Sequence, residues 1–369
     1  MKNELAIGII GAGSFAAFAA DAFLEVDGVR VVAVCDENIE QAKKLATILN
    51  AIFYTDYGEF LKDAAINLVY IATPPFLHFQ MSLKALNAGK HVICEKPAAL
   101  TTAEVEVVQG LAKKLKLLYV VNLMQRYNPL YDVVKKIVTK KLMGNFLHGF
   151  FENYASDENL NEQHWFWNEA KSGGIFIEHG VHFFDMFSGW LGKGKIVSAF
   201  KLRRKTVTPI IFDRVQATVL YKGGPVNFYH GFDQPKTLDR QEMRLQFEKG
   251  DVTLFEWIPV KIKLRGLFKT ADLKTLMEIM GPCTIFEQTV AQERSVRGRF
   301  ADIIYDHDVT IESGSSNLKT SRYQEMLTAM LIDQWSWIRN SEHTRIIDDS
   351  NAIESVRMGE DATMIAQQF

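Results

Sequence analysis

The fold of the first third of the chain is decided by residues 5–23, LAIGIIGAGSFAAFAADAF. The stretch opens with a short apolar run, residues 5–10, which is typical of a strand buried on both faces. A turn with two glycines follows. After it, apolar residues recur at helical spacing on one face: Phe15, Phe18, Ala19, Ala22 and Phe23. The stretch therefore predicts a strand, a tight turn and a helix, in that order.

The turn itself, Gly11-Ala12-Gly13-Ser14-Phe15-Ala16, fits the dinucleotide-binding fingerprint with alanine in the last position. The first glycine makes the turn, the second lets backbone N–H groups approach a pyrophosphate, and the last small residue lets helix and strand touch. Asp36 follows the second predicted strand. A carboxylate there binds both ribose hydroxyls and repels a 2′-phosphate, so we expect NAD, with NADP as the alternative. Asp36 could instead only cap the next helix.

Strands and helices alternate through residues 1–122, which predicts a Rossmann-type α/β domain with a doubly wound parallel sheet. Beyond residue 122, longer β-type runs with few helical breaks predict an α+β domain with a large, mostly antiparallel open sheet over residues 123–369. The best strand candidates of this second domain are residues 146–154, 196–207, 213–221, 226–232, 243–247 and 252–257.

Composition excludes several classes of protein. The 369 residues are 47% hydrophobic and 23% charged, which excludes disordered and collagen-like proteins. Lys and Arg (42) nearly balance Asp and Glu (44), so we expect neither nucleic acid nor a membrane surface as a partner. Three cysteines form neither a disulfide framework nor the spacing of a zinc site, so we expect a cytoplasmic protein. The uncharged run at residues 5–20 is too short to span a bilayer as a helix.

Further motifs, taken with the fingerprint, resemble a known family. They are Ala72-Thr73-Pro74-Pro75 with His78, then Glu95-Lys96-Pro97, then Gly173-Gly174 followed by Glu178, Gly180, His182 and Asp185. In kind and order they resemble the glucose–fructose oxidoreductase and inositol dehydrogenase (Gfo/Idh/MocA) family. The resemblance implies a nucleotide-binding domain and an open sheet that builds the substrate site and an oligomer interface, here of a homodimer or homotetramer. It implies an NAD(P)-dependent dehydrogenase that acts on the CH–OH group of a polyol, sugar or sugar derivative.

The resemblance also assigns roles to residues. Lys96 would lie between nicotinamide and substrate and stabilise a developing alkoxide. His182 is the expected general base, because the ordinary pKa of histidine lies close to physiological pH. Glu178 would orient the imidazole, although relatives usually have aspartate there. Cofactor contacts are expected from Gly11, Gly13, Ser14, Phe15, Ala16, Asp36, Thr73, Pro74, His78, Glu95 and Lys96.

Structural alternatives remain for the catalytic candidates. His179, His182 and Asp185 recur at i, i+3 and i+6 and could hold a metal ion, but we expect none, because nothing nearby completes a ligand shell. His182 could also be a hydrogen-bonded core histidine. Lys96 could be a solvated lysine at a strand end, and Asp185 is expected to position or cap a helix rather than to react.

Substrate contacts are expected from Arg126, Trp165 and Trp167. Arg126 could bind a carboxylate or phosphate, or form a salt bridge. The tryptophans could stack on a sugar, or belong to the core. Two basic clusters, one of Lys201, Arg203, Arg204 and Lys205 and one of Arg294, Arg297 and Arg299, are expected to be solvated strand faces, with a nucleotide-sugar phosphate site as the alternative for the second.

Two other functions fit the same motifs. A redox-assisted glycosidase would hold NAD tightly and return the hydride after bond cleavage, so that it turns over without net NADH. A non-catalytic NAD-binding sensor would keep the fold alone. The glutamate at position 178 favours the sensor, whereas the presence of Lys96 and His182 opposes it.

Overall fold

The structure is a computed structural model that describes residues 4–204 and 208–369, with the backbone alone for residues 287–292. The chain divides into two compact units. The first comprises Met1–Tyr127, Trp165–Asp185 and Tyr323–Glu360, and the second comprises Asn128–His164, Met186–Arg322 and Asp361–Phe369. The sequence predicted a single boundary at residue 122, whereas the first unit takes in two later segments.

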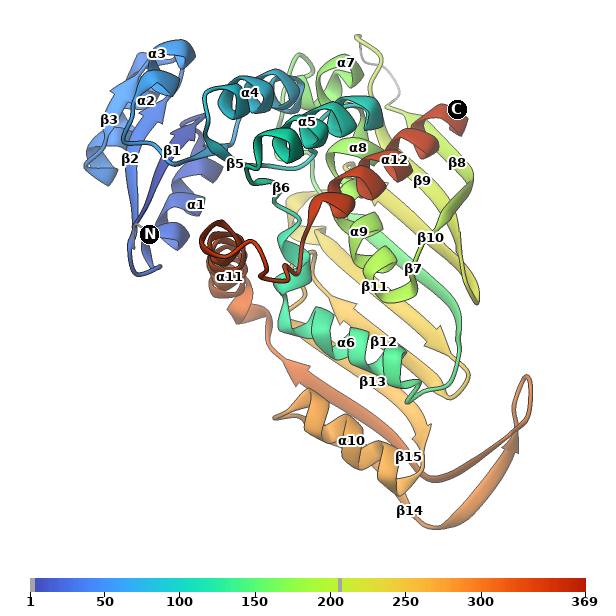
Figure 1. The fold of residues 1–369 in the computed structure, drawn as a ribbon. Coiled ribbons are helices and arrows are strands. Elements are labelled where there is room, and N and C mark those ends of the chain that lie inside the picture. Colours follow the sequence, from blue (N-terminus) through green and yellow to red (C-terminus); the bar gives the residue numbers. More distant parts are fainter. Residues whose placement is uncertain (1–3, 205–207) are drawn as a thin grey trace. The chain divides into compact units, whose positions relative to one another are not determined.

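The first unit contains a parallel sheet in the order β3-β2-β1-β4-β5-β6 (Figure 1). Its strands are β1 (Leu5–Ile10), β2 (Val29–Cys35), β3 (Ile52–Tyr54), β4 (Leu68–Ile71), β5 (His91–Cys94) and β6 (Tyr119–Val121). This order confirms the doubly wound Rossmann sheet. It also reverses direction between β1 and β4, and ligands of such sheets bind at this point, beyond the carboxyl ends of the strands.

Several helices of the first unit begin where the sequence supplies a capping side chain or a proline. They are α1 (Ser14–Leu24), α2 (Ile39–Leu49), α3 (Tyr57–Lys62), α4 (Pro75–Asn87) and α5 (Thr102–Leu115), together with the short α7 (Glu169–Ser172) and α8 (Ile175–Glu178). Thr101 caps α5 by accepting a hydrogen bond from the backbone N–H of Glu104, as the Thr-x-x-Glu spacing predicts. Three later helices each begin in one unit and end in the other: α9 (Gly180–Leu191), α11 (Lys319–Arg339) and α12 (Asp349–Ile365).

The second unit is built on a mostly antiparallel sheet in the order β14-β15-β13-β12-β11-β7-β10-β9-β8-β16, as the sequence predicts. Its strands are β7 (Phe146–Tyr154), β8 (Lys195–Arg203), β9 (Phe212–Tyr221), β10 (Gly224–Gly231), β11 (Arg240–Phe247), β12 (Gly250–Phe255), β13 (Lys261–Phe268), β14 (Thr284–Arg297), β15 (Asp302–Gly314) and β16 (Gln367–Gln368). The expected strand 196–207 ends at Arg203, and its last three residues lie outside the described part of the chain.

One face of this sheet is buried and the other is polar. Along β11, Met243, Leu245 and Phe247 are buried, whereas Arg240 and Arg244 are exposed. This alternation places apolar side chains on the face where α6 (Pro129–Lys140) and α10 (Thr270–Met280) lie (Figure 1).

No helix in the described ranges combines the length and the apolar composition needed to cross a membrane.

Candidate active site

The glycine turn after β1 has the geometry of a phosphate-binding turn. Gly11 has φ of +90°, and a Cβ there would lie 2.5 Å from the carbonyl oxygen of Ala72, so only glycine fits. A Cβ on Gly13 would meet no atom within 4 Å. Gly13 is also the N-cap of α1, and no described side chain caps that helix end. The backbone N–H groups of the first helical turn are therefore not bonded to a capping side chain, and they fit the pyrophosphate of a dinucleotide.

Asp36 lies at the carboxyl end of β2 and is bonded to the glycine turn. Its Oδ2 accepts a hydrogen bond of 2.8 Å from the backbone N–H of Ala12, and its Oδ1 accepts one of 2.8 Å from that of Asn38. Asn38, rather than Asp36, caps α2. The capping alternative for Asp36 is therefore wrong. Each carboxylate oxygen keeps a lone pair with which to accept a ribose hydroxyl, so the residue fits the adenosine ribose of NAD.

His78, on α4, supports the site from inside the protein. The side chain is fully buried, and its ring nitrogens lie 2.7 Å from the carbonyl oxygens of Pro97 and Thr73. Burial lowers the pKa of His78. Its contact with a cofactor stays a prediction, and the ring, whose two nitrogens both face backbone carbonyl oxygens, donates a hydrogen bond from one of them. It ties the Thr73-Pro74 turn to the Lys96-Pro97 turn, whose peptide bond is cis.

Glu95, directly after β5, has a similar supporting role. Its Oε1 accepts hydrogen bonds from the hydroxyl of Tyr70 and, at 2.7 Å, from the side-chain amide of Asn122. Burial raises the pKa of Glu95, and its hydrogen bonds oppose that rise. The carboxylate anchors the backbone just before Lys96, and its contact with a cofactor stays a prediction.

Lys96 and Glu178 form a close ion pair. The Nζ of Lys96 lies 2.5 Å from Oε1 of Glu178 and 2.8 Å from its main-chain oxygen. Their side chains are 19% and 11% exposed, so the pair is largely shielded from water. Lys96 is therefore not the solvated lysine that the sequence left as an alternative. Glu178 holds Lys96, and no hydrogen bond joins it to Nδ1 of His182 in the described part of the chain.

His182, in the first turn of α9, is nearly buried at 4% exposure. Its Nδ1 is buried and has no hydrogen-bond partner among the described residues, so the alternative of a hydrogen-bonded core histidine does not fit. Burial lowers the pKa of His182 well below its ordinary value, and the positive charge of Lys96 lowers it further. The imidazole is therefore neutral at physiological pH and able to accept a proton.

Asp185, one turn after His182, is held by two partners. Arg126 lies in a short 3₁₀ helix, η1 (Met124–Tyr127), and donates to both carboxylate oxygens of Asp185, at 2.7 and 2.8 Å. Asn351, on α12, donates to Oδ1 at 3.0 Å. Asp185 is thus the positioning residue that the sequence suggested, and Arg126 forms the salt bridge that was the alternative to substrate binding.

The metal alternative has no structural support within the described residues, where no group of three or more His, Cys, Asp or Glu side chains could hold an ion. The tryptophans lie in η2 (Trp165–Trp167). Trp167 is buried, in line with its core alternative, whereas Trp165 is half-buried and keeps part of its ring accessible.

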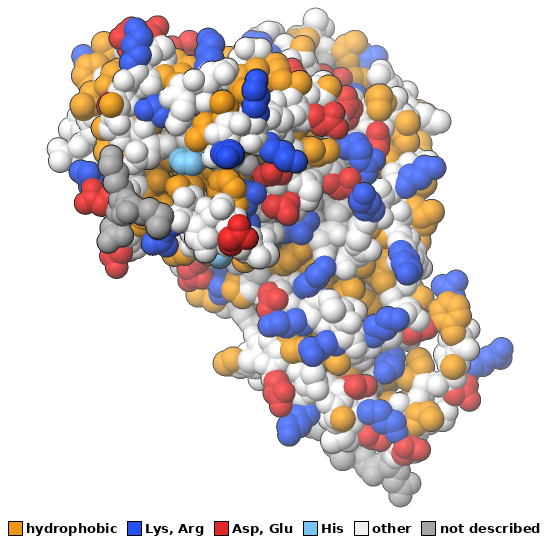
Figure 2. Space-filling model, viewed as in Figure 1, with side chains coloured by type: hydrophobic (Ala, Val, Ile, Leu, Met, Phe, Trp, Pro, Cys, Tyr) orange, Lys and Arg blue, Asp and Glu red, His pale blue; other side chains and the backbone are white. Residues whose placement is uncertain are grey.

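The first basic cluster is not a solvated face throughout. Lys201 is buried, and Arg204 pairs with Asp157 at 3.1 Å and with Asp213 at 2.9 Å. Lys205 lies outside the described residues. Arg294, Arg297 and Arg299 are exposed, as expected. Acidic and basic side chains are interspersed on the face drawn in Figure 2.

Two of the supporting residues were absent from the sequence prediction. Tyr70 lies in the middle of an apolar strand and Asn351 in a C-terminal helix, and neither position carries a motif. A third is Asn122. It offers a weak signal, because it is a polar residue directly after a buried parallel strand, where ligands of such sheets bind.

Two family profiles match the chain in this order. One, described as "Oxidoreductase family, NAD-binding Rossmann fold", matches residues 5–123, and the other, "GFO/IDH/MocA C-terminal domain", matches residues 131–253. The chain belongs to the Gfo/Idh/MocA family. Membership confirms the resemblance read from the motifs and the prediction of an NAD-binding domain.

Individual relatives are more distant. An oxidoreductase of Formosa agariphila is 26% identical over 298 residues, which are 79% of this chain and 91% of that protein. The glucose-6-phosphate 3-dehydrogenase of Bacillus subtilis is 28% identical over 184 residues, 49% of this chain and 52% of that enzyme. The WlbA dehydrogenase of Bordetella pertussis, solved with NADH and UDP-GlcNAcA, shares the fold with a TM-score of 0.78 at 17% identity, over 98% of this chain and 95% of that one.

Proposed function

We propose that this protein is an NAD-dependent dehydrogenase that oxidises a CH–OH group of a polyol, sugar or sugar derivative, and reduces the corresponding ketone in reverse. The observation that carries the proposal is the contact of Lys96 with Glu178 beside a neutral His182 that lacks a partner for Nδ1. An ammonium donor can stabilise a developing alkoxide, and a neutral imidazole beside it can accept the hydroxyl proton, as alcohol oxidation needs.

Lys96 would bind the reacting oxygen. An ammonium has three N–H donors, and two of those on Lys96 are used by Glu178. The third remains for the substrate hydroxyl, where it would stabilise the alkoxide character that develops as the proton leaves. Glu178 fixes the direction of this donor by holding the other two.

His182 would accept the hydroxyl proton. A protonated imidazole beside the Lys96 ammonium would be unfavourable, because the two positive charges repel each other. The carboxylate of Glu178 reduces this cost, since it already balances the charge of Lys96. When bound, NAD supplies the nicotinamide that accepts the hydride. The protein contributes position and proton transfer.

The choice of NAD is supported by Asp36, whose carboxylate is fixed by two backbone N–H groups, and by Glu37 next to it. Both acids would repel the 2′-phosphate of NADP. A sugar-related substrate is supported by the names of two proteins with which the chain shares sequence or fold, the glucose-6-phosphate 3-dehydrogenase and the dehydrogenase solved with UDP-GlcNAcA. The thiols of Cys35, Cys94 and Cys283 support a cytoplasmic location. We also propose a homo-oligomer assembled through the second unit.

The test is NADH formation from NAD, with NADP in parallel, against a panel of inositols, common sugars and sugar acids. Lys96→Met and His182→Ala should each lose most of the turnover but bind NAD as the wild type does, and Lys62→Met, an exposed lysine in a surface ion pair, is the matched control. Unchanged turnover in both site variants would reject the assignment. Product formed without net NADH would favour the redox-assisted glycosidase. A signal with NADP alone would overturn the inference from Asp36.

A further inference from the structure

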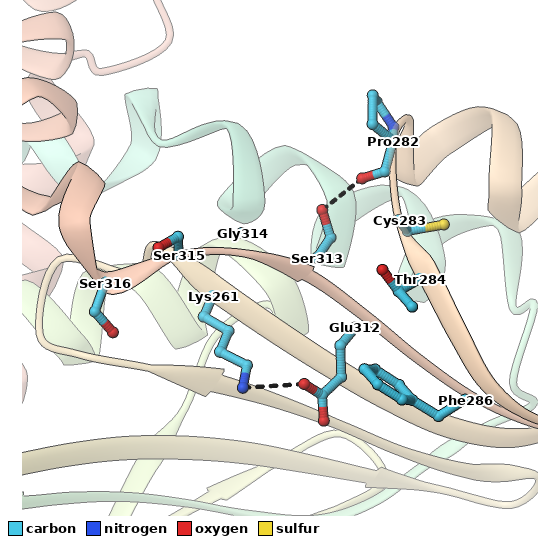
Figure 3. Close-up of a pocket in the computed structure, with 10 residues that line it drawn as sticks. All are labelled: Lys261, Pro282, Cys283, Thr284, Phe286, Glu312, Ser313, Gly314, Ser315 and Ser316. Carbon is cyan, nitrogen blue, oxygen red and sulfur yellow. Dashed lines mark hydrogen bonds and ion pairs between the residues drawn. The ribbon is translucent and has the colours of Figure 1, made fainter.

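A cavity of about 650 Å³ opens in the second unit, on residues that take no part in the site described above. Figure 3 shows its wall, which is formed by three neighbouring strands, β13, β15 and β14, and by the turn that leads from β15 into the short 3₁₀ helix η4 (Ser316–Leu318). The volume lies within the ~300–1,000 Å³ of ordinary small-molecule sites.

An aromatic ring stands at the edge of this cavity. The pairing of β14 with β15 shifts between Ile285 and Glu287, which leaves Phe286 in a bulge. Bulges re-aim a side chain, and here the ring of Phe286 is 62% exposed beside the carboxylate of Glu312 (Figure 3). A large exposed ring at a polar cavity offers a flat apolar surface to a ligand.

The charged side chains at the wall are paired with one another. Glu312 accepts from Lys261 at 3.0 Å and from Lys263 at 3.2 Å, and both lysines lower the pKa of Glu312. A polyphosphate would meet an ionised carboxylate here rather than unpaired cations, and a wholly apolar ligand would strip water from an ion pair. The cavity therefore favours a ligand that is polar and uncharged.

Hydroxyl groups complete the lining. Thr284 and Ser316 contribute hydroxyls that have no hydrogen-bond partner among the described side chains, and Lys261 keeps donors beyond the one used by Glu312. The two hydroxyls can donate to, or accept from, a neighbouring hydroxyl of a ligand, and the ammonium can donate to one. A pyranose has one apolar C–H face and a rim of hydroxyls, which is the pattern that this lining complements.

We infer that this cavity is a carbohydrate-binding subsite, in which the ring of Phe286 stacks on the face of a neutral pyranose while Glu312, Lys261, Thr284 and Ser316 bind its hydroxyls. No reaction occurs there. The inference is independent of the proposed dehydrogenase activity, because it rests on none of the residues of that site.

The test is saturation-transfer-difference NMR of the full chain with D-glucose, D-galactose and cellotriose, followed by titration of whichever sugar binds. Phe286→Ala should weaken binding about tenfold, which corresponds to the loss of ~1.4 kcal/mol of aromatic contact, and Phe286→Trp should restore it. Phe300→Ala is the matched control, since Phe300 is 67% exposed and lies outside the cavity.

Repeating the titrations in a second variant distinguishes binding at this subsite from binding at the proposed catalytic site. Binding that depends on Phe286 should persist in the Lys96→Met variant, whereas a sugar bound only at the catalytic site would be insensitive to Phe286. The inference is overturned if none of the three sugars gives a transfer signal, if Phe286→Ala binds as the wild type does, or if Phe300→Ala weakens binding equally.

Discussion

Replacing Gly13 with alanine tests the phosphate-binding turn without any knowledge of the substrate. The backbone of Gly13, with φ of −71° and ψ of 176°, is open to any L-residue, and its new Cβ would meet nothing within 4 Å. Alanine stabilises the folded state by about 0.4–1 kcal/mol, because it lowers the conformational entropy of the unfolded chain, but it is a poorer N-cap than glycine. The free energy of unfolding should therefore stay within ~1 kcal/mol of the wild type.

The effect on cofactor binding should be much larger. The methyl group of Gly13→Ala would occupy the open space over the first turn of α1, where phosphate oxygens must come within about 3 Å of backbone N–H groups. Loss of one charge-assisted hydrogen bond costs about 1.5–3 kcal/mol. NAD should then bind roughly 10- to 100-fold more weakly.

The assay is calorimetric titration with NAD, paired with urea unfolding of the same samples. Gly11→Ala supplies the contrast, because its Cβ would lie 2.5 Å from the carbonyl oxygen of Ala72 at a φ of +90°. That substitution should lower the free energy of unfolding by more than ~2 kcal/mol, since the left-handed backbone alone costs about 1–2 kcal/mol. A folded Gly13→Ala protein that binds NAD within twofold of the wild type would refute the phosphate-binding turn.

Three further predictions concern charge and pH. Glu178→Gln keeps the hydrogen bond from Lys96 to the main-chain oxygen but removes the ion pair, so kcat should fall about 10- to 100-fold while NAD affinity stays unchanged. Glu178→Asp keeps the charge, so equal losses of kcat in Glu178→Asp and Glu178→Gln would contradict a role for that charge. Asn351→Ala removes a hydrogen bond to Asp185 and should let water reach His182. Because the pKa of His182 is lowered mainly by burial, that pKa should rise, and the acid limb of the pH profile of kcat/KM should move to higher pH. A slower enzyme whose acid limb does not move would indicate that Asn351 has a structural role only. Burial lowers the pKa of His230 to about 3. As the pH drops below about 6.5, the unfolded chain binds a proton at this histidine before the folded chain does, so stability falls. His230→Gln should remove about 2 kcal/mol of the difference in unfolding free energy between pH 7.5 and pH 5, and an unchanged difference would disprove that assignment.

Local patterns predicted the first unit well because its strands are buried on both faces. Continuous apolar runs such as Leu5–Ile10 and Leu68–Ile71 are hard to mistake, and the glycine fingerprint places the turn between strand and helix. The short elements β3 and α3 escaped prediction. β3 is an edge strand with two exposed apolar residues, so it lacks the burial pattern that marks a strand.

Contacts between distant segments explain the rest. The roles proposed for Lys96 and His182 were suggested by motifs, but the partner of Lys96 was not, because Glu178 is 82 positions away in the chain. Glu178 was expected to orient His182, four residues later in the chain, yet the short helix α8 ends at Glu178 and the chain turns before α9 begins at Gly180. Sequence periodicity carries no information about such a bend. For the same reason, the hydrogen bond from Asn351 to Asp185 is known only from the structure.

The hydrogen bond between Asn351 and Asp185 has a consequence for the order in which parts of the site are completed during synthesis. The six-stranded sheet is complete once residue 121 has been made, so a nascent chain of that length already contains the glycine turn, Asp36 and Lys96. The helix start that carries His182 comes some sixty residues later, and its second anchor, Asn351, nearly at the end of the chain. The strands and the glycine turn are therefore made first, whereas the core of the first unit, which includes Leu331 and Val356, and the second anchor of Asp185 are complete only when the last helix has been made.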